Sequence, residues 1–143
     1  MIVDKNTLVF RKATVEDIPE LIKFKIMLLD ELGEDKNKED LEQLKIELEK
    51  FFKEYLEKNE FVSWLAEFDG KIVATSGLIL WRIAPRYDCL HGRYGYILNM
   101  YTVPEFRKHG ISTWLLKMLI EEAKKMNIDI LNLHATKDGI GMY

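Results

Sequence analysis

The chain has 143 residues, of which 48% are hydrophobic, so it is long enough to bury the core of one compact domain. We therefore expect a single domain over residues 1–143. The 21 basic and 24 acidic residues give a net charge of −3, which excludes the strongly basic surface typical of a nucleic-acid-binding protein and gives no general attraction to an anionic membrane.

The cysteine content and the N-terminus indicate where the protein resides. Cys89 is the single cysteine, which rules out an internal disulfide and is typical of a reducing compartment. The first residues lack the basic region, apolar core and cleavage site of a secretion signal, and no uninterrupted apolar run approaches membrane-spanning length. We predict a cytoplasmic protein with no membrane partner, no nucleic-acid partner and no metal site.

The first third of the chain predicts a strand and two helices. Residues 8–13 (LVFRKA) predict the strand, and Thr14 followed by Asp17 resembles a capping box at a helix start. The helix is expected to end near Gly33, and its apolar residues recur at helical spacing: Ile18, Leu21, Ile22, Ile26 and Leu29. Residues 38–58 predict the second helix.

The middle of the chain predicts a β-hairpin and a loop. Residues 61–68 and 71–83 are rich in β-branched and aromatic residues and are separated by Asp69-Gly70, a typical hairpin turn. Residues 84–93 contain Pro85 and Gly92 and predict an exposed loop. Because no partner for a nucleophile is evident there, we interpret Cys89 as an incidental loop thiol.

The most informative stretch is 94–126. Residues 94–103 predict a buried strand that ends before Pro104, because proline cannot donate to a sheet. After Gly110, apolar residues recur at helical spacing to Met126. The first N–H groups of a helix lack internal partners and carry the positive end of its dipole, so they favour an anion.

The turn before this helix therefore predicts a phosphate site. Gly110 allows close approach of the backbone, Arg107 and Lys108 add positive charge, and Ser112 and Thr113 are small enough to leave room. With a single glycine in the turn, both the P-loop and the dinucleotide-binding fingerprint are excluded. The alternative is a tight turn whose charged side chains are merely solvated.

A last strand completes the predicted order of elements. Asn127 closes the helix, and residues 128–135 (IDILNLHA) predict a strand that a helix connects to strand 94–103. A strand, helix and strand in this order favour a parallel crossover. The whole chain then reads β, α, α, β, β, β, α, β, which predicts an α/β domain with a mixed sheet and helices on its faces.

The phrase 107–112 (RKHGIS), directly after Val103-Pro104, resembles the pyrophosphate loop of the GNAT acyltransferases, Gln/Arg-x-x-Gly-x-Gly/Ala. Ser112 stands where that family prefers glycine or alanine. The opening phrase 11–17 (RKATVED) is also similar to the family's. This resemblance covers about residues 8–143 and implies a mixed, mostly antiparallel sheet with helices on both faces.

The resemblance also implies something about the end of the chain. The family normally has a Leu-Tyr pair in its last helix, where this sequence has Met142-Tyr143, and then continues into one or two more strands. We therefore expect those C-terminal strands to be missing from this sequence or to be supplied by another chain, which allows a homodimer.

The activity implied by the resemblance is acetyl transfer from acetyl-CoA to an amine. The pyrophosphate would lie on the turn and helix start, the pantetheine arm beside 100–103, and a backbone N–H near Met100 or Tyr101 would polarise the thioester carbonyl. Thr136 stands where the family has a pantetheine-binding asparagine. The coenzyme residues so implied are Met100, Tyr101, Thr102, Val103, Arg107, Lys108, His109, Gly110, Ile111, Ser112, Thr113 and Thr136.

The resemblance further implies catalytic and acceptor residues. Tyr143 matches the family's tyrosine that protonates the departing thiolate, and a phenol with a pKa of about 10 stays protonated at neutral pH. His134 and Glu31 are the candidates for the general base. Leu29, Glu31 and Asn99 are expected near the acceptor. For Tyr143 and His134 a purely structural role remains open.

Three functions remain open at this point. The leading hypothesis is an N-acetyltransferase that joins an acetyl group to a primary amine of a small molecule or peptide by direct attack in a ternary complex. The alternative is a catalytically inactive acyl-CoA-binding or regulatory module of the same fold. The third is an interaction protein whose helix 38–58 binds a partner.

Overall fold

The computed structural model describes residues 3, 5–33 and 38–133. The predicted order of strands and helices is confirmed over this part of the chain, except that the strand predicted at 61–68 is divided at Ser63 into two strands. Short 3₁₀ turns lie at Lys5–Thr7, Val15–Asp17 and Pro104–Phe106. The strands and helices are β1 (Leu8–Lys12), α1 (Ile18–Glu31), α2 (Lys38–Glu57), β2 (Phe61–Val62), β3 (Trp64–Phe68), β4 (Lys71–Arg82), β5 (Arg93–Thr102), α3 (Ile111–Lys125) and β6 (Ile130–Leu133).

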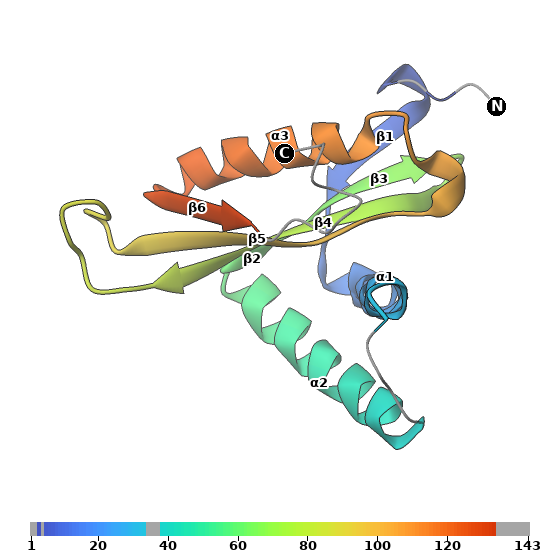
Figure 1. Cartoon of the computed structure of the whole chain (residues 1–143), viewed down its shortest axis with the longest axis horizontal. Helices are drawn as coiled ribbons and strands as arrows, with labels where there is room; N and C mark the ends of the chain where they lie inside the picture. The colour runs from blue at the N-terminus through green and yellow to red at the C-terminus, as the bar shows by residue number, and fades with distance from the viewer. Residues whose placement is uncertain (1–2, 4, 34–37, 134–143) are drawn as a thin grey trace.

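The strands form one mixed sheet. Its order is β1-β3-β4-β5-β6, with β2 pairing β4, and every pair is antiparallel except β5 with β6. Figure 1 shows α3 along one face of the sheet and α1 and α2 on the other. The predicted mixed, mostly antiparallel sheet with helices on both faces is confirmed, as is the parallel crossover through α3.

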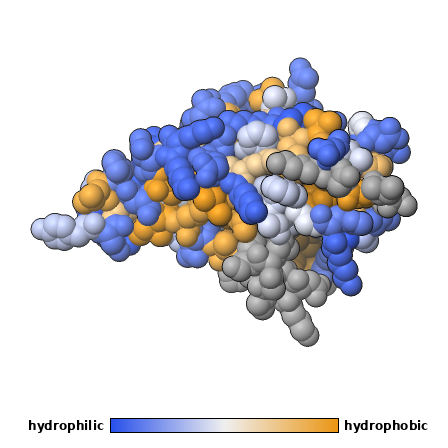
Figure 2. Space-filling view, turned by 90° about the horizontal axis from the view of Figure 1, so that it is seen from above, coloured by the Kyte–Doolittle hydropathy of each residue, from blue (hydrophilic) through white to orange (hydrophobic). Residues whose placement is uncertain are grey.

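The core follows from the apolar periodicity of the helices. On one face, Ile111, Leu115 and Leu119 recur at four-residue spacing along α3 and are buried against the sheet. The outer side of α3 is hydrophilic, and an apolar strip lies beside it (Figure 2). On the other face, Leu21 of α1 and Phe52 of α2 pack over β2, β3 and β4. Within the part of the chain that the structure covers, no helix has the length and apolar character to cross a bilayer.

The predicted capping box before α1 is present. Asp17 accepts from the backbone N–H of Thr14 at 2.8 Å, and the Thr14 hydroxyl accepts from the N–H of Glu16. Arg11 donates to both oxygens of Asp17 at 2.8 Å and also contacts Glu67 on β3. The guanidinium bonds hold the pKa of Asp17 below its ordinary value. Asp17 therefore fixes the start of α1 to the sheet.

Asp17→Asn is expected to lower the free energy of unfolding by about 2 kcal/mol at pH 7, because charge-assisted bonds to Arg11 are lost while the cap is kept. A folded-state pKa below the ordinary value stabilises the fold fully above about pH 4, and this contribution disappears as pH falls through the lowered pKa. Urea titrations should therefore separate the two proteins at pH 7 and converge at acidic pH. Glu16→Gln, an exposed change in the same turn, is the control, and equal stability of Asp17→Asn and the parent at pH 7 would contradict the prediction.

The connection between β4 and β5 is exposed over most of its length, as predicted, but Cys89 is not the incidental loop thiol that was expected. Tyr87 and Leu90 are exposed, but Cys89 is completely buried and its Sγ lies 3.5 Å from Oδ2 of Asp129, which precedes β6. Asp129 also accepts from the backbone N–H of His91 at 2.9 Å, and its Oδ1 lies 2.7 Å from Nδ1 of that ring. Burial raises the pKa of the Cys89 thiol, and the Asp129 carboxylate raises it further. These contacts anchor the loop to the residues before β6.

Candidate functional site

A β-bulge interrupts the C-terminal half of β5. Leu98 pairs with Gly77 and Tyr101 with Thr75, so two residues, Asn99 and Met100, stand opposite one residue of β4. Asn99 has a φ of 58°, in the left-handed region, and its carbonyl oxygen accepts from the Thr75 hydroxyl at 3.1 Å. No local motif in the sequence predicted this bulge.

Beyond the bulge, one edge of β5 faces away from β4. In the part of the chain that the structure describes, β6 pairs with Tyr94 to Ile97 on this edge. The N–H of Val103 donates to the carbonyl of Val73 on β4, and peptide groups alternate along a strand, so those of Met100 and Thr102 point to the edge away from β4. The bulge thus lies where a backbone N–H is directed away from β4.

The turn after β5 leads into α3 through a glycine N-cap. Gly110 has a φ of 81° and offers no side chain to the first amides of the helix. Among described atoms, a Cβ at Gly110 would meet nothing closer than Trp114 Nε1 at 4.0 Å, so the space outside the helix start is open. The side chain of Ile111 is buried, and the N–H groups in the first turn of a helix have no acceptor within the helix. This start of α3 fits a phosphate group.

The other side chains predicted to bind coenzyme at this turn differ in exposure and in their contacts. Lys108 and His109 are exposed, and Lys108 has a φ of 67°. The hydroxyls of Ser112 and Thr102 lie 2.9 Å apart, which ties the first turn of α3 to the end of β5. Val103 and Thr113 are partly buried.

Arg107 is directed at α1 rather than at the start of α3. Its terminal nitrogen donates to both oxygens of Glu31, at 2.7 and 2.8 Å, and its Nε donates to the Thr102 carbonyl at 2.8 Å. The hydroxyl of the buried Tyr101 also donates to Glu31, at 3.0 Å. Burial raises the pKa of Tyr101, and the Glu31 carboxylate raises it further. Arg107 was predicted to place its positive charge beside a phosphate. In this structure its guanidinium is instead paired with the carboxylate of Glu31.

Helix α1 brings a second group to the bulge. The ammonium of Lys25 donates to Oδ1 of Asn99 at 2.7 Å, and the ring of Phe24 packs 5.8 Å from that of Tyr101. The structure therefore places Asn99 and Glu31, both predicted near an acceptor, along the contact between α1 and β5, with Leu29 partly buried on the same helix. Sequence reasoning missed Lys25, because a lysine on a helix is ordinarily solvated and the contact depends on the bulge.

Three predicted residues lie outside the described part of the chain. His134, Thr136 and Tyr143 belong to residues 134–143, so their proposed roles in proton transfer and coenzyme binding stay predictions.

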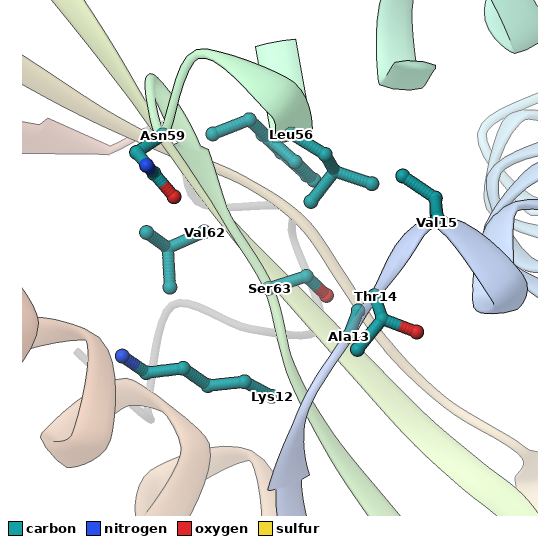
Figure 3. Close-up of a pocket in the computed structure, with 9 residues that line it drawn as sticks. Lys12, Ala13, Thr14, Val15, Leu56, Asn59, Val62 and Ser63 are labelled. Carbon is teal, nitrogen blue, oxygen red and sulfur yellow. The ribbon is translucent and has the colours of Figure 1, made fainter.

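A separate pocket lies at the C-terminal end of β1. It has a volume of about 330 Å³, and Figure 3 shows the side chains around it. The ammonium of Lys12 at this pocket pairs with the buried Glu122 of α3 at 2.8 Å. None of its lining residues was predicted to bind coenzyme or acceptor; they are Lys12, Ala13, Thr14, Val15, Leu56, Asn59, Phe61, Val62 and Ser63.

Comparisons with known proteins show which proteins share this sequence pattern and fold. The sequence model described as the acetyltransferase (GNAT) family matches residues 26–143. A predicted acetyltransferase from Clostridium acetobutylicum, crystallised with acetyl-CoA, has a TM-score of 0.88 and 36% identity, over 95% of this chain and 86% of that one. None of the curated proteins compared with the chain is significantly similar.

Two further crystal structures share the fold. A GCN5-related N-acetyltransferase from Ralstonia eutropha JMP134 has a TM-score of 0.85 and 24% identity, over 95% of this chain and 88% of that one. Glucosamine-6-phosphate N-acetyltransferase from Arabidopsis thaliana has a TM-score of 0.71 and 20% identity, over 96% of this chain and 88% of that one. At these identities the likeness concerns the fold alone.

Proposed function

The chain belongs to the acetyltransferase (GNAT) family, and on that premise we propose that it transfers the acetyl group of acetyl-CoA to a primary amine of a small molecule or peptide by direct attack in a ternary complex. The observation that carries this proposal is the junction of β5 and α3. There the bulge lies where the N–H of Met100 is directed away from β4, beside a helix start at which a Cβ on Gly110 would meet no described atom closer than 4.0 Å.

Different groups at this junction would bind different portions of acetyl-CoA. The first backbone amides of α3 would hold the pyrophosphate, because they combine unpaired donors with the positive end of the helix dipole. The edge of β5 that faces away from β4, from Met100 to Val103, would accept the pantetheine amides as an added strand. The N–H of Met100 would donate to the thioester oxygen, where negative charge develops during attack.

The reaction needs balanced proton movements. The amine loses a proton and attacks the carbonyl carbon, the C–N bond forms, the C–S bond breaks, and the thiolate takes up a proton. Both oxygens of Glu31 accept from Arg107, and one also accepts from Tyr101, so Glu31 is better placed to orient these side chains than to accept the proton of the amine. His134 is the remaining candidate base, and Tyr143 the candidate acid.

Two measurements on the chain test this function. Acetyl-CoA is expected to raise the unfolding temperature, because a ligand that binds the native state stabilises it, by about 2.7 kcal/mol at a hundred times the dissociation constant. Thiol release is then expected with at least one member of a panel of amino acids, polyamines, aminoglycosides and peptides. An unchanged unfolding temperature would contradict coenzyme binding. A raised temperature without thiol release would favour the inactive acyl-CoA-binding module.

A further inference from the structure

We propose that Glu31 competes with the phosphates of the coenzyme for Arg107, so that the guanidinium exchanges a carboxylate for a phosphate when acetyl-CoA binds. The inference rests on the proposed function, because it concerns how the acyl donor is held. It makes Glu31 a positioning residue for Arg107, and it fixes the sign of the effect, since Glu31 then lowers the affinity for acetyl-CoA.

The contacts of the Arg107 guanidinium carry the first step. Its terminal nitrogen donates to both oxygens of Glu31, at 2.7 and 2.8 Å, and its Nε donates to the carbonyl of Thr102 at 2.8 Å. Its Cζ lies 5.4 Å from the centre of the Tyr101 ring, within the range of a cation–π contact. These contacts hold the guanidinium towards the end of α1.

The location of this ion pair carries the second step. Arg107 lies in the turn between β5 and α3, three residues before Gly110, and the amides that follow Gly110 are proposed to hold the diphosphate. Glu31 is the last residue of α1, on the face of the sheet opposite α3 (Figure 1). The pair thus joins α1 to the turn that leads to the phosphate site. The proposed exchange needs a rotation of the Arg107 side chain, while the strand and the helix keep their places.

The exposure of the pair decides which partner prevails. The side chains of Arg107 and Glu31 are 40% and 42% exposed. An ion pair this exposed typically changes an equilibrium by no more than about fivefold, whereas a charge-assisted bond to a phosphate changes it by about tenfold or more. The diphosphate should therefore displace Glu31, which still accepts from the Tyr101 hydroxyl at 3.0 Å. The affinity for acetyl-CoA is lowered by the strength of the pair that is broken.

The test begins with a binding titration of acetyl-CoA on the parent chain and on two variants. Glu31→Gln is expected to bind acetyl-CoA about threefold to fivefold more tightly, because no ion pair has to be broken. Glu105→Gln is the matched control, since Glu105 is an exposed carboxylate two residues from Arg107 in the same turn, and its loss changes the net charge equally. Its affinity for acetyl-CoA should stay close to that of the parent chain.

Two further comparisons assign the effect to the phosphates and to Arg107. S-acetylpantetheine carries the thioester but no phosphate, so Glu31→Gln should bind it with the affinity of the parent chain. Arg107→Met is expected to bind acetyl-CoA roughly tenfold more weakly than the parent chain. Adding Glu31→Gln to Arg107→Met should then change nothing further, because the two residues act as one pair.

The outcomes separate this inference from the proposed function. If the parent chain binds acetyl-CoA and Glu31→Gln binds it equally or more weakly, the inference is overturned and the proposed function stands. The same holds if the gain is equal in Glu105→Gln, extends to S-acetylpantetheine or persists in the Arg107→Met background. A parent chain that does not bind acetyl-CoA would overturn the proposed function, and the inference with it.

Discussion

Gly110→Trp is expected to abolish acetyl-CoA binding, with a dissociation constant at least about 100-fold higher, or roughly 2.7 kcal/mol of lost binding free energy. The reason is steric. A Cβ at Gly110 would meet no described atom closer than Trp114 Nε1, at 4.0 Å. An indole ring there would fill the space in which the pyrophosphate is proposed to meet the first amides of α3. The buried residues of this helix, Ile111 and Leu115, face the sheet and are not disturbed.

Two variants separate the steric effect from backbone strain. Gly110 has a φ of 81°, so any side chain costs about 1 kcal/mol or more of stability there. Gly110→Ala carries this strain without the bulk and is expected to bind acetyl-CoA much more tightly than Gly110→Trp. Gly70→Trp places the same indole at a φ of 77° in the β3–β4 turn, where a Cβ also meets nothing described within 4 Å, and should leave binding unchanged.

The measurements are a direct binding titration with acetyl-CoA and a thermal unfolding curve for each variant. Gly110→Trp should unfold at a temperature close to that of Gly70→Trp, and only Gly70→Trp should be stabilised by acetyl-CoA. If Gly110→Trp binds acetyl-CoA with the affinity of the parent chain, the start of α3 is not the phosphate site, and the proposed arrangement of the coenzyme is wrong.

The features that sequence reasoning predicted correctly are those set by neighbouring residues. Proline at 104 ends β5, glycine at 110 starts α3 in a left-handed conformation, and Asp69-Gly70 turns the chain with both residues at positive φ. The capping box at Thr14 and Asp17 also forms as predicted. Each signal depends on the conformational preferences of one or two residues, which tertiary contacts did not override here.

The features that sequence reasoning missed depend on residues far apart in the chain. Glu31 and Arg107 are separated by 76 positions and Lys25 and Asn99 by 74, and each pair meets because α1 packs against the end of β5. The bulge at Asn99 arises from a shift in pairing with β4, to which no local motif points. Cys89 was expected to be exposed because its loop contains proline and glycine, but Asp129 on a distant segment covers it.

This division also applies to the candidate site. The coenzyme half rests on a local pattern, a strand end, a glycine turn and a helix start, so it could be predicted. The residues predicted near an acceptor lie where helix α1 meets β5, and nothing in the order of residues states which side chains of α1 reach that strand. The contact of Lys25 with Asn99 emerged only from this packing.

Tyr143→Phe is expected to lower kcat by about 100-fold with the dissociation constant of acetyl-CoA unchanged, because loss of a general acid typically costs a factor of 10² to 10⁴. Tyr143 lies outside the described residues, and its role rests on the match between Met142-Tyr143 and the Leu-Tyr pair of the family. Phenylalanine keeps the ring and removes only the hydroxyl, so a loss confined to kcat would indicate a missing proton donor rather than a lost packing contact.

The pH dependence and a matched control make this prediction specific. A tyrosine acts as an acid only while it is protonated, so the kcat of the parent chain should fall at alkaline pH, and Tyr143→Phe should lack that decrease. Tyr87→Phe removes the same hydroxyl from a side chain that is 100% exposed in the β4–β5 connection and should leave kcat unchanged. Full activity of Tyr143→Phe at pH 7 would mean that another group protonates the thiolate, and an activity loss matched by weaker acetyl-CoA binding would assign Tyr143 to the coenzyme instead.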